Sequence, residues 1–183
     1  MDLFTVGHGR RTFDEFVGLL KRYEISAIAD VRTRPVSRWA PWFNKAHLSK
    51  KLEDEGITYL FMGEELGGRP DDDDLYTDEG YVKYRRVSDT SLFKMGFDRL
   101  VENAKSYKIA VMCSESDHAG CHRNLLIGRV AEIGGLQVIH INKSGDLEDF
   151  DLHLLDDGLA GLEDEWISAV EVKEAADPTS HSH

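Results

Sequence analysis

Short apolar runs alternate with segments of helical periodicity along most of the chain, and this alternation limits the folds open to it more than any other feature. Strands that alternate with helices favour a parallel sheet covered on both faces. The sequence therefore predicts an α/β protein, a three-layer α/β/α fold around a mainly parallel sheet of about five strands. The patterns predict strands over 3–6, 25–31, 57–62, 108–112 and 137–141, and helices over 12–23, 44–56, 88–105 and 121–133.

The first predicted helix carries a start signal. Thr12 and Glu15 have the spacing of a capping box, in which each side chain binds the other residue's backbone N–H. By contrast, residues 63–86 contain Gly67-Gly68, Pro70 and four consecutive aspartates, and we expect a long irregular segment there. A loop of that length usually binds a ligand, acts as a lid or lacks fixed structure.

The charge of the 183-residue chain differs sharply between its two ends. Residues 1–50 carry nine basic and five acidic side chains, whereas residues 144–183 carry one and twelve. We expect a single α/β domain over 1–143. Like-charged runs repel each other, so 144–183 is expected to form an acidic extension with one helix near 162–170 and no structure in the last ten residues or so.

Composition also argues against several classes of protein. The net charge of −12 disfavours nonspecific duplex binding, which depends on neutralising phosphates with Lys and Arg. The apolar runs are far too short to cross a bilayer. The first residues have a strand pattern rather than that of a signal peptide. We therefore expect no membrane partner. Because the chain has only two cysteines, we also expect a cytoplasmic protein with no disulfide scaffold.

Charged residues gather where the predicted strands end. In parallel sheets, ligands bind just past the carboxyl ends of the strands, which share one edge. Arginine grips phosphates and carboxylates with two donors, and glycines around a histidine let a ligand approach the backbone. We therefore expect these residues to bind a small anion in a crevice at that edge: His8, Arg11, Arg32 and Arg123.

The segment from Cys113 to Arg123 offers reactive side chains. It joins a strand to a helix, so Cys121 and His122 are expected at a helix N-terminus, where free N–H groups lower thiol pKa values. Cys121, with His122 beside it, is a candidate nucleophile, and Glu115 is a candidate general acid or base.

Three other interpretations of this segment stay open. Cys113 ends a predicted buried strand and could be a small hydrophobic residue. Cys113, His118, Cys121 and His122 could bind zinc, although their spacing matches no common zinc pattern. The two cysteines could form a redox pair, although seven residues separate them where the usual motif has two. We assign no metal ligand and no cofactor.

A basic and aromatic loop follows the second strand. Arg34 and Arg38 precede Trp39, Trp42 and Phe43. Aromatic and basic side chains together can stack the bases of single-stranded nucleic acid. More often such a cluster packs onto its own domain or forms a subunit contact, and a homodimer is one of the outcomes that this loop suggests.

The order of several motifs resembles the domain of unknown function 488 family over about residues 3–142. The resemblance lies in Gly7-His8 with Arg11-Thr12, Asp30-Val31-Arg32 with Pro35, Ser37 and Arg38, Phe43-Asn44-Lys45, Glu65-Leu66-Gly67-Gly68, and Cys113-x-Glu115 followed by Cys121-His122-Arg123. It implies a small α/β domain and assigns no activity.

Three functions follow as hypotheses. The first is an enzyme, or degenerate enzyme, that binds a small anionic substrate such as a nucleotide or a nucleic-acid component. The second is a non-catalytic module that binds single-stranded nucleic acid or a partner protein. The third is a metal-dependent enzyme.

Overall fold

The computed structural model describes residues 1–152, 155 and 166–168. Its centre is a six-stranded sheet of order β3-β2-β4-β1-β5-β6, in which the first five strands run parallel and β6 pairs antiparallel with β5. The predicted α/β fold with a mainly parallel sheet is confirmed. The strands are β1 (Asp2–Gly7), β2 (Ala27–Asp30), β3 (Thr58–Phe61), β4 (Ile109–Cys113), β5 (Gln137–Ile141) and β6 (Leu147–Asp149).

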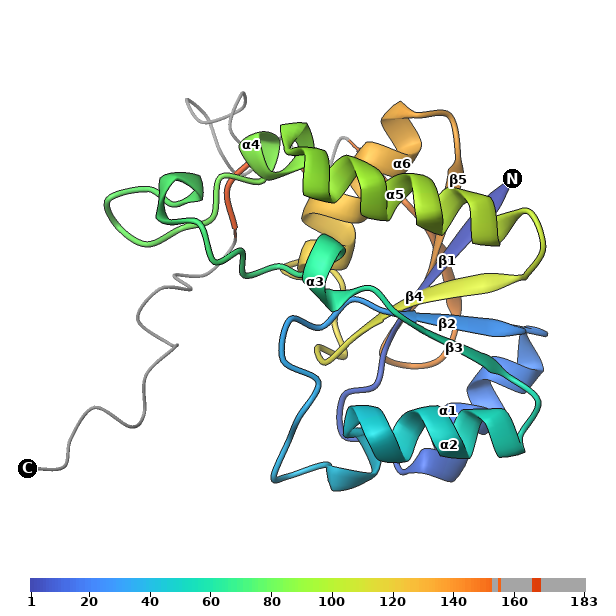
Figure 1. Cartoon of the computed structure of the whole chain (residues 1–183). Coiled ribbons are helices and arrows are strands. Elements are labelled where there is room, and N and C mark those ends of the chain that lie inside the picture. The colour runs from blue at the N-terminus through green and yellow to red at the C-terminus, as the bar shows by residue number, and fades with distance from the viewer. Residues whose placement is uncertain (153–154, 156–165, 169–183) are drawn as a thin grey trace, which may run out of the picture.

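Helices cover both faces of the sheet, which gives the three layers (Figure 1). On one face lie α1 and α2, and on the other lie α5, α6 and the turns beside them. The helical segments are α1 (Phe13–Arg22), η1 (Pro41–Phe43), α2 (Lys45–Asp54), α3 (Gly63–Leu66), η2 (Asp73–Leu75), α4 (Tyr84–Asp89), α5 (Ser91–Ala104), η3 (Arg123–Gly128) and α6 (Arg129–Ile133).

Each face of the sheet has its own apolar core. Phe16 of α1 and Leu48 of α2 are fully buried on one side, and Phe93 and Leu100 of α5 are almost fully buried on the other. Successive residues of a strand point to opposite faces, so β4 sends Met112 toward α1 and α2 and sends Cys113 toward the α5 and α6 side. This alternation decides which core Cys113 joins.

Local signals explain how α1 begins. Thr12 Oγ1 accepts the Glu15 N–H at 3.2 Å, and the Glu15 carboxylate accepts the Thr12 N–H at 2.7 Å. The predicted capping box is therefore confirmed. It places α1 immediately after the loop that follows β1, which keeps that loop short.

Two predicted segments differ from the structure. Residues 63–86 are not wholly irregular, because α3, η2 and the start of α4 interrupt them. The helix predicted over 121–133 begins as the wide π-helical turn η3 and continues as α6. Wide turns of this kind are frequent at functional sites. In η3 this turn buries both Arg123 and Asn124.

The acidic extension is described only in part. The sheet continues past the predicted boundary at residue 143, because Leu147–Asp149 form its edge strand. Of the helix predicted near 162–170, the structure describes 166–168. These residues are not helical: Ile167 forms a bridge with Lys83, and the Ser168 N–H donates to the Val82 carbonyl at 2.9 Å. The helix prediction is wrong for 166–168, because the backbone groups of these residues form hydrogen bonds with the segment before α4.

The last ten residues of the chain lie outside the described residues. Among the described helices, none has the length and apolar character needed to cross a bilayer.

Candidate functional site

The loops after β1 and β4 meet at the carboxyl edge of the sheet. The His8 N–H donates to the Cys113 carbonyl at 3.1 Å, and the Gly9 N–H donates to the Ser114 carbonyl at 3.0 Å. A Cβ on Gly7 would lie 1.7 Å from the Glu115 carbonyl oxygen, so only glycine allows the two chains to approach this closely. The backbone thus fixes Cys113 and Glu115 beside the end of β1.

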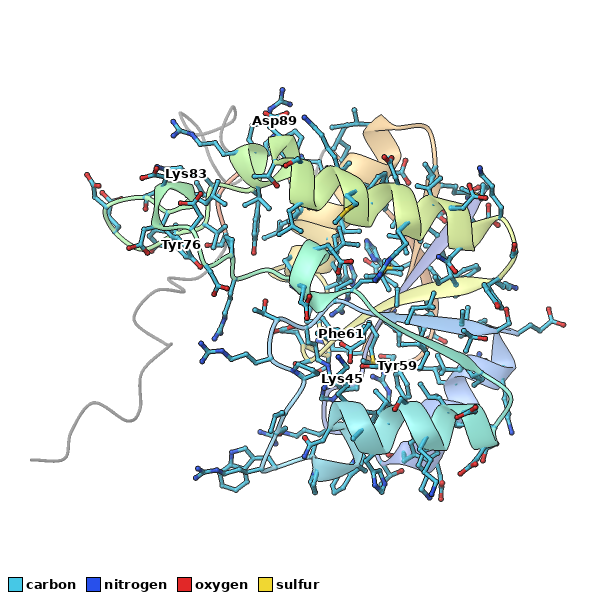
Figure 2. The ribbon with its side chains drawn as sticks, in the orientation of Figure 1. Lys45, Tyr59, Phe61, Tyr76, Lys83 and Asp89 are labelled. Carbon is cyan, nitrogen blue, oxygen red and sulfur yellow. The ribbon has the colours of Figure 1, made fainter. Side chains whose placement is uncertain are left out.

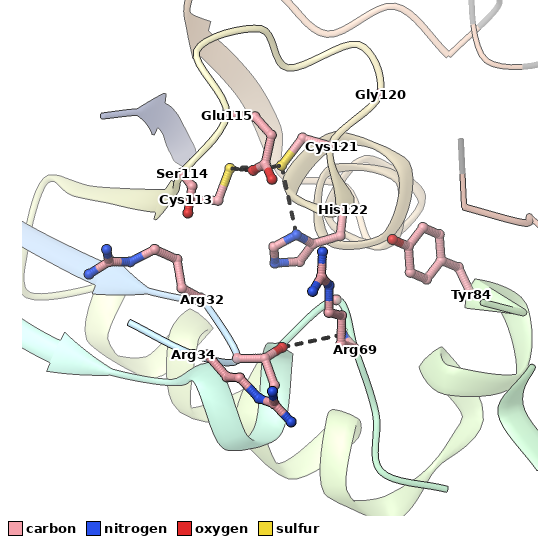
Figure 3. Close-up of a pocket in the computed structure, with 12 residues that line it drawn as sticks. Arg32, Arg34, Arg69, Tyr84, Cys113, Ser114, Glu115, Gly120, Cys121 and His122 are labelled. Carbon is pink, nitrogen blue, oxygen red and sulfur yellow. Dashed lines mark hydrogen bonds between the residues drawn. The ribbon is translucent and has the colours of Figure 1, made fainter. Parts of the chain in front are cut away.

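A cavity of about 210 Å³ opens at this edge (Figure 3). Two sulfurs, a carboxylate and an imidazole gather in it, with three arginines and a tyrosine among the other lining side chains. The lining residues are Arg32, Thr33, Arg34, Gly68, Arg69, Tyr84, Cys113, Ser114, Glu115, Gly120, Cys121 and His122.

The two cysteines and Glu115 are in direct contact. The sulfur atoms of Cys113 and Cys121 lie 2.7 Å apart, and both thiols are free. Glu115 Oε2 lies 2.8 Å from the Cys113 sulfur and 3.2 Å from the Cys121 sulfur, so one carboxylate oxygen faces both. Cys113 is buried, as predicted for a strand end, yet it is also part of the polar cluster.

His122 completes the cluster on the side of Cys121. Its Nε2 lies 3.1 Å from the Val31 carbonyl oxygen, and its Nδ1 lies 3.7 Å from the Cys121 sulfur. A carbonyl oxygen can only accept, so Nε2 carries the proton. In the neutral ring Nδ1 then offers its lone pair to Cys121, the arrangement that allows a histidine to take a thiol proton.

These contacts separate the pKa values of the two thiols. Burial disfavours ionisation of Cys121, but the hydrogen bond from Cys113 and the charge of His122 lower its pKa to about 5. Burial and the hydrogen bond with Cys121 raise the pKa of Cys113 well above its ordinary value. The pair therefore holds one thiolate, at Cys121, and one thiol, at Cys113.

The pKa values of the other two members of the cluster are shifted in opposite directions. Burial opposes ionisation of Glu115. The hydrogen bonds with Cys113, with its own backbone and with Cys121 outweigh burial and lower the Glu115 pKa to about 2. Burial disfavours the imidazolium of His122, but the adjacent Cys121 thiolate outweighs burial and raises the His122 pKa.

Arg123 lies behind the cavity rather than in its lining. Its side chain is fully buried, and one guanidinium nitrogen donates to the Cys113 sulfur at 2.5 Å and to the Glu115 carbonyl oxygen at 2.8 Å. It therefore neutralises the negative charge of the cluster from inside the protein. We expected Arg123 to bind an external anion, but in this structure it binds the reactive segment itself.

Arg32 lines the cavity but is already paired. Its guanidinium donates to both carboxylate oxygens of Asp30, at 2.8 and 2.6 Å, and to the Phe43 carbonyl at 2.7 Å. Tyr59 of β3, labelled in Figure 2, donates its hydroxyl to Asp30 at 2.6 Å. The buried ion pair fixes Arg32 firmly and cancels most of its charge.

His8 is buried next to Arg32, outside the cavity lining. Its ring stacks on Phe43 with centroids 4.2 Å apart, and its Nε2 lies 3.4 Å from the Arg32 guanidinium. Burial and the charge of Arg32 lower the His8 pKa to about 4, so the ring is neutral at neutral pH. A neutral, stacked imidazole supports Arg32 and adds no positive charge for an anion.

Arg11 lies away from the cavity. Its guanidinium donates to the carbonyls of Gly7 at 2.6 Å, Lys143 at 2.8 Å and Asn142 at 3.2 Å. These bonds join the loop after β1 to the loop after β5.

Seven residues were named from the sequence. The structure brings four of them into one cavity: Arg32, Glu115, Cys121 and His122. It sets His8 and Arg123 behind this cavity and places Arg11 elsewhere.

Arg69 and Tyr84 also line the cavity, and the sequence analysis named neither of them. Arg69 follows Gly68, where a Cβ would lie 2.7 Å from Cγ of His122, so the glycine lets this loop rest on the imidazole. Figure 3 shows the Arg69 side chain extending toward His122. The signal was available, because Gly67-Gly68-Arg69 comes soon after β3, another parallel strand that ends at the same edge.

Arg34 and Arg69 supply the uncompensated positive charge of the cavity. Both side chains are exposed, and in the described part of the chain neither forms an ion pair with a carboxylate. Arg32, by contrast, is neutralised by Asp30. Any selectivity of this cavity for anions therefore depends on Arg34 and Arg69.

A metal ion would need the same cluster. Cys113, Glu115 and Cys121 each offer one ligand atom, all within 4.8 Å of one another. Two thiolates on one tetrahedral zinc would lie about 3.8 Å apart, given Zn–S bonds of about 2.3 Å. The observed 2.7 Å is much shorter, and the Arg123 cation already contacts one of the sulfurs. The residues would have to move apart to hold zinc.

Comparison with known families finds a matching family model. The family model described as "Domain of unknown function DUF488" matches residues 12–130. The chain belongs to the DUF488 family. The match extends from the cap of α1 into α6 and so includes every cavity-lining residue. No curated protein and no solved structure matches this DUF488 chain.

Proposed function

We propose that this DUF488 protein is an enzyme whose nucleophile is the Cys121 thiolate and whose substrate is a small anion. One observation carries the proposal: the Cys121 sulfur lies in the cavity 3.7 Å from His122 Nδ1. The hydrogen bond from Cys113 and the charge of His122 agree with it, because they lower the Cys121 pKa to about 5. Thiolates are the reactive form of cysteine, and active sites are where such shifts concentrate.

The substrate class follows from the size and charge of the cavity. At about 210 Å³ it is smaller than the cavities of about 300–1,000 Å³ that hold drug-sized ligands. Arg34 and Arg69 have no carboxylate partner among the described residues, so they can pair with a phosphate, sulfonate or carboxylate group. The proposed substrate therefore carries its negative group near the atom that Cys121 attacks.

Each side chain of the cluster has a role in the proposed reaction. His122 takes the thiol proton at Nδ1 and can return it to the leaving group. Tyr84 is a neutral donor facing the cavity, because burial raises its pKa. Glu115 contacts both sulfurs and holds them in place, and Arg123, behind the cavity, balances their negative charge.

Alkylation with two matched reagents tests the proposal without knowledge of the substrate. Iodoacetate is an anion and iodoacetamide is its neutral analogue, so the ratio of their rates at Cys121 measures anion attraction. We expect this ratio to exceed that of a cysteine peptide by at least threefold, and inorganic phosphate to slow both reactions. A ratio equal to that of the peptide would overturn the anionic substrate class.

Variants assign the effect to the arginines. Arg34→Gln and Arg69→Gln together should return the ratio of rates to the peptide value. Arg10→Gln is the matched control, because Arg10 is an exposed arginine beside a different hollow of the surface. It should leave the ratio unchanged.

A second candidate function rests on Trp39. This side chain is 93% exposed and lies between Arg38 and the buried Ala40, so it is available to stack on a base or a partner protein. A single-stranded oligonucleotide should then quench the tryptophan fluorescence of the wild type but not that of Trp39→Phe. The affinity for the oligonucleotide should fall as the salt concentration rises. Absence of quenching would leave the enzyme as the better account.

A further inference from the structure

The two sulfurs of the cavity are in direct contact, and the proposed nucleophile uses only one of them. Cys113 ends β4 and Cys121 directly precedes His122, so different elements hold the two residues. Their sulfurs lie 2.7 Å apart, whereas a disulfide needs about 2.05 Å. A shift of well under 1 Å would join them.

The two sulfurs are also chemically different. Cys121 holds the negative charge and faces His122, while Cys113 keeps its proton and contacts Glu115 Oε2 at 2.8 Å. A dithiol pair is most reactive when one sulfur is ionised and accessible and the other is positioned to attack the product. Both residues line the cavity and are almost fully buried, with Cys121 beside His122 and Cys113 against Arg123.

We propose that Cys121 and Cys113 form a reversible dithiol–disulfide couple and that a small hydroperoxide is its oxidising substrate. This inference rests on the proposed function in one respect, the assignment of Cys121 as the attacking thiolate.

The chemistry balances in two steps. The Cys121 thiolate attacks the distal oxygen of the hydroperoxide; the S–O bond forms, the O–O bond breaks, and the departing alkoxide or hydroxide takes a proton from His122. Cys121 is then a sulfenic acid. The Cys113 sulfur attacks the Cys121 sulfur, the S–S bond forms, and the sulfenic hydroxyl leaves with the Cys113 proton as water. The protein loses two electrons, and the peroxide is reduced.

The surrounding residues suit both steps. Glu115 Oε2 contacts both sulfurs and so orients the Cys113 thiol toward its partner. The Arg123 guanidinium contacts the Cys113 sulfur and stabilises the charge that develops there when its proton leaves. The small cavity admits a hydroperoxide and limits access by a folded protein.

The 183-residue chain, with any bound metal first removed by a chelator, tests the couple directly because it contains only two cysteines. One equivalent of hydrogen peroxide should reduce the thiol count of the denatured protein from two to zero. The mass should fall by about 2 Da as two hydrogens leave. A dithiol reductant should restore both thiols. Loss of one thiol with a gain of oxygen, or no faster loss than in a denatured control, would overturn the proposal.

Single variants assign the order of events. Cys113→Ser should stop at the sulfenic acid on Cys121, which dimedone captures. Cys121→Ser should leave Cys113 at least tenfold less reactive toward peroxide than Cys121 is in Cys113→Ser. Equal reactivity of the two thiols would contradict the assignment of Cys121 as the attacking sulfur.

Two further outcomes separate this inference from the proposed function. If iodoacetamide modifies Cys121 readily at neutral pH but peroxide yields no disulfide, the couple is wrong and the nucleophile stands. If zinc copurifies at one equivalent and must be removed before either thiol reacts, the cluster is a metal site and the couple is wrong.

Discussion

Gly68 lies directly against His122: a Cβ at residue 68 would be 2.7 Å from Cγ of the imidazole. The loop that carries Arg69 can therefore approach the cluster of Cys113, Glu115, Cys121 and His122 only because residue 68 has no side chain. This contact couples the arginine at the cavity to the histidine that stabilises the Cys121 thiolate.

Gly68→Ala should displace either His122 or the Arg69 loop. We expect slower alkylation of Cys121 and a smaller iodoacetate preference, because both depend on that contact. The control is Gly18→Ala on α1, where a Cβ would meet nothing within 4 Å. That variant should leave both rates unchanged and stabilise the helix by roughly 0.5–1 kcal/mol. An unaltered alkylation profile in Gly68→Ala would contradict the role given to this contact.

His122→Asn should raise the Cys121 pKa by roughly 1–3 units, since it removes the adjacent positive charge. The measurement is the pH dependence of alkylation, whose midpoint should move toward that of an ordinary cysteine. His47→Asn, on the exposed surface of α2, is the matched control and should leave the midpoint in place. If the midpoint in His122→Asn stays at its wild-type value, His122 does not stabilise the thiolate.

Asp30→Asn tests the ion pair that fixes Arg32. The substitution leaves a buried guanidinium without its carboxylate, and breaking a buried pair in this way costs about 3–5 kcal/mol. Urea denaturation should show that loss. Glu55→Gln breaks an exposed pair with Lys21 and should cost less than about 1 kcal/mol. A loss in Asp30→Asn as small as that in the control would mean that Asp30 does not hold Arg32.

Two neutral histidines should make stability depend on pH. Burial and the charge of Arg32 lower the His8 pKa to about 4, and burial followed by the charge of His118 lowers that of His140 to about 3. In the unfolded chain both bind a proton below about pH 6.5, whereas the folded chain resists. The stabilisation is therefore fully present above pH 6.5 and is lost as the pH falls toward 4 and 3.

Denaturant titrations at pH 7 and 5.5 measure this loss, which should be about 1 kcal/mol for each histidine. His140→Gln should show a smaller difference between the two pH values, whatever its stability at pH 7. An equal difference in the variant would mean that His140 does not contribute to the pH dependence.

The fold was largely predictable because its signals are local. The capping box of Thr12 and Glu15 and the apolar strand runs need no knowledge of distant residues. Edge strand β6 could not be predicted in the same way, since three exposed residues of an acidic segment carry no strand pattern of their own. They pair because β5 offers an open edge.

The site was predictable only where the strand-end rule applied. That rule brought Arg32, Glu115 and Cys121 to one edge, as found. It could not distinguish an arginine that faces the cavity from one already bound to protein carbonyls, such as Arg11. Nor could it foresee the contact between Cys113 and Cys121, which depends on the direction of one strand residue and on the wide turn of η3.

The rate of Cys121 alkylation by iodoacetamide between pH 4 and 9 tests the central claim most directly, with mass spectrometry to locate the modified cysteine. A thiolate with its pKa near 5 predicts a rate that reaches its plateau by about pH 6 and stays flat to pH 9. A rate that keeps rising through pH 8 to 9, as for a free cysteine, would contradict the account.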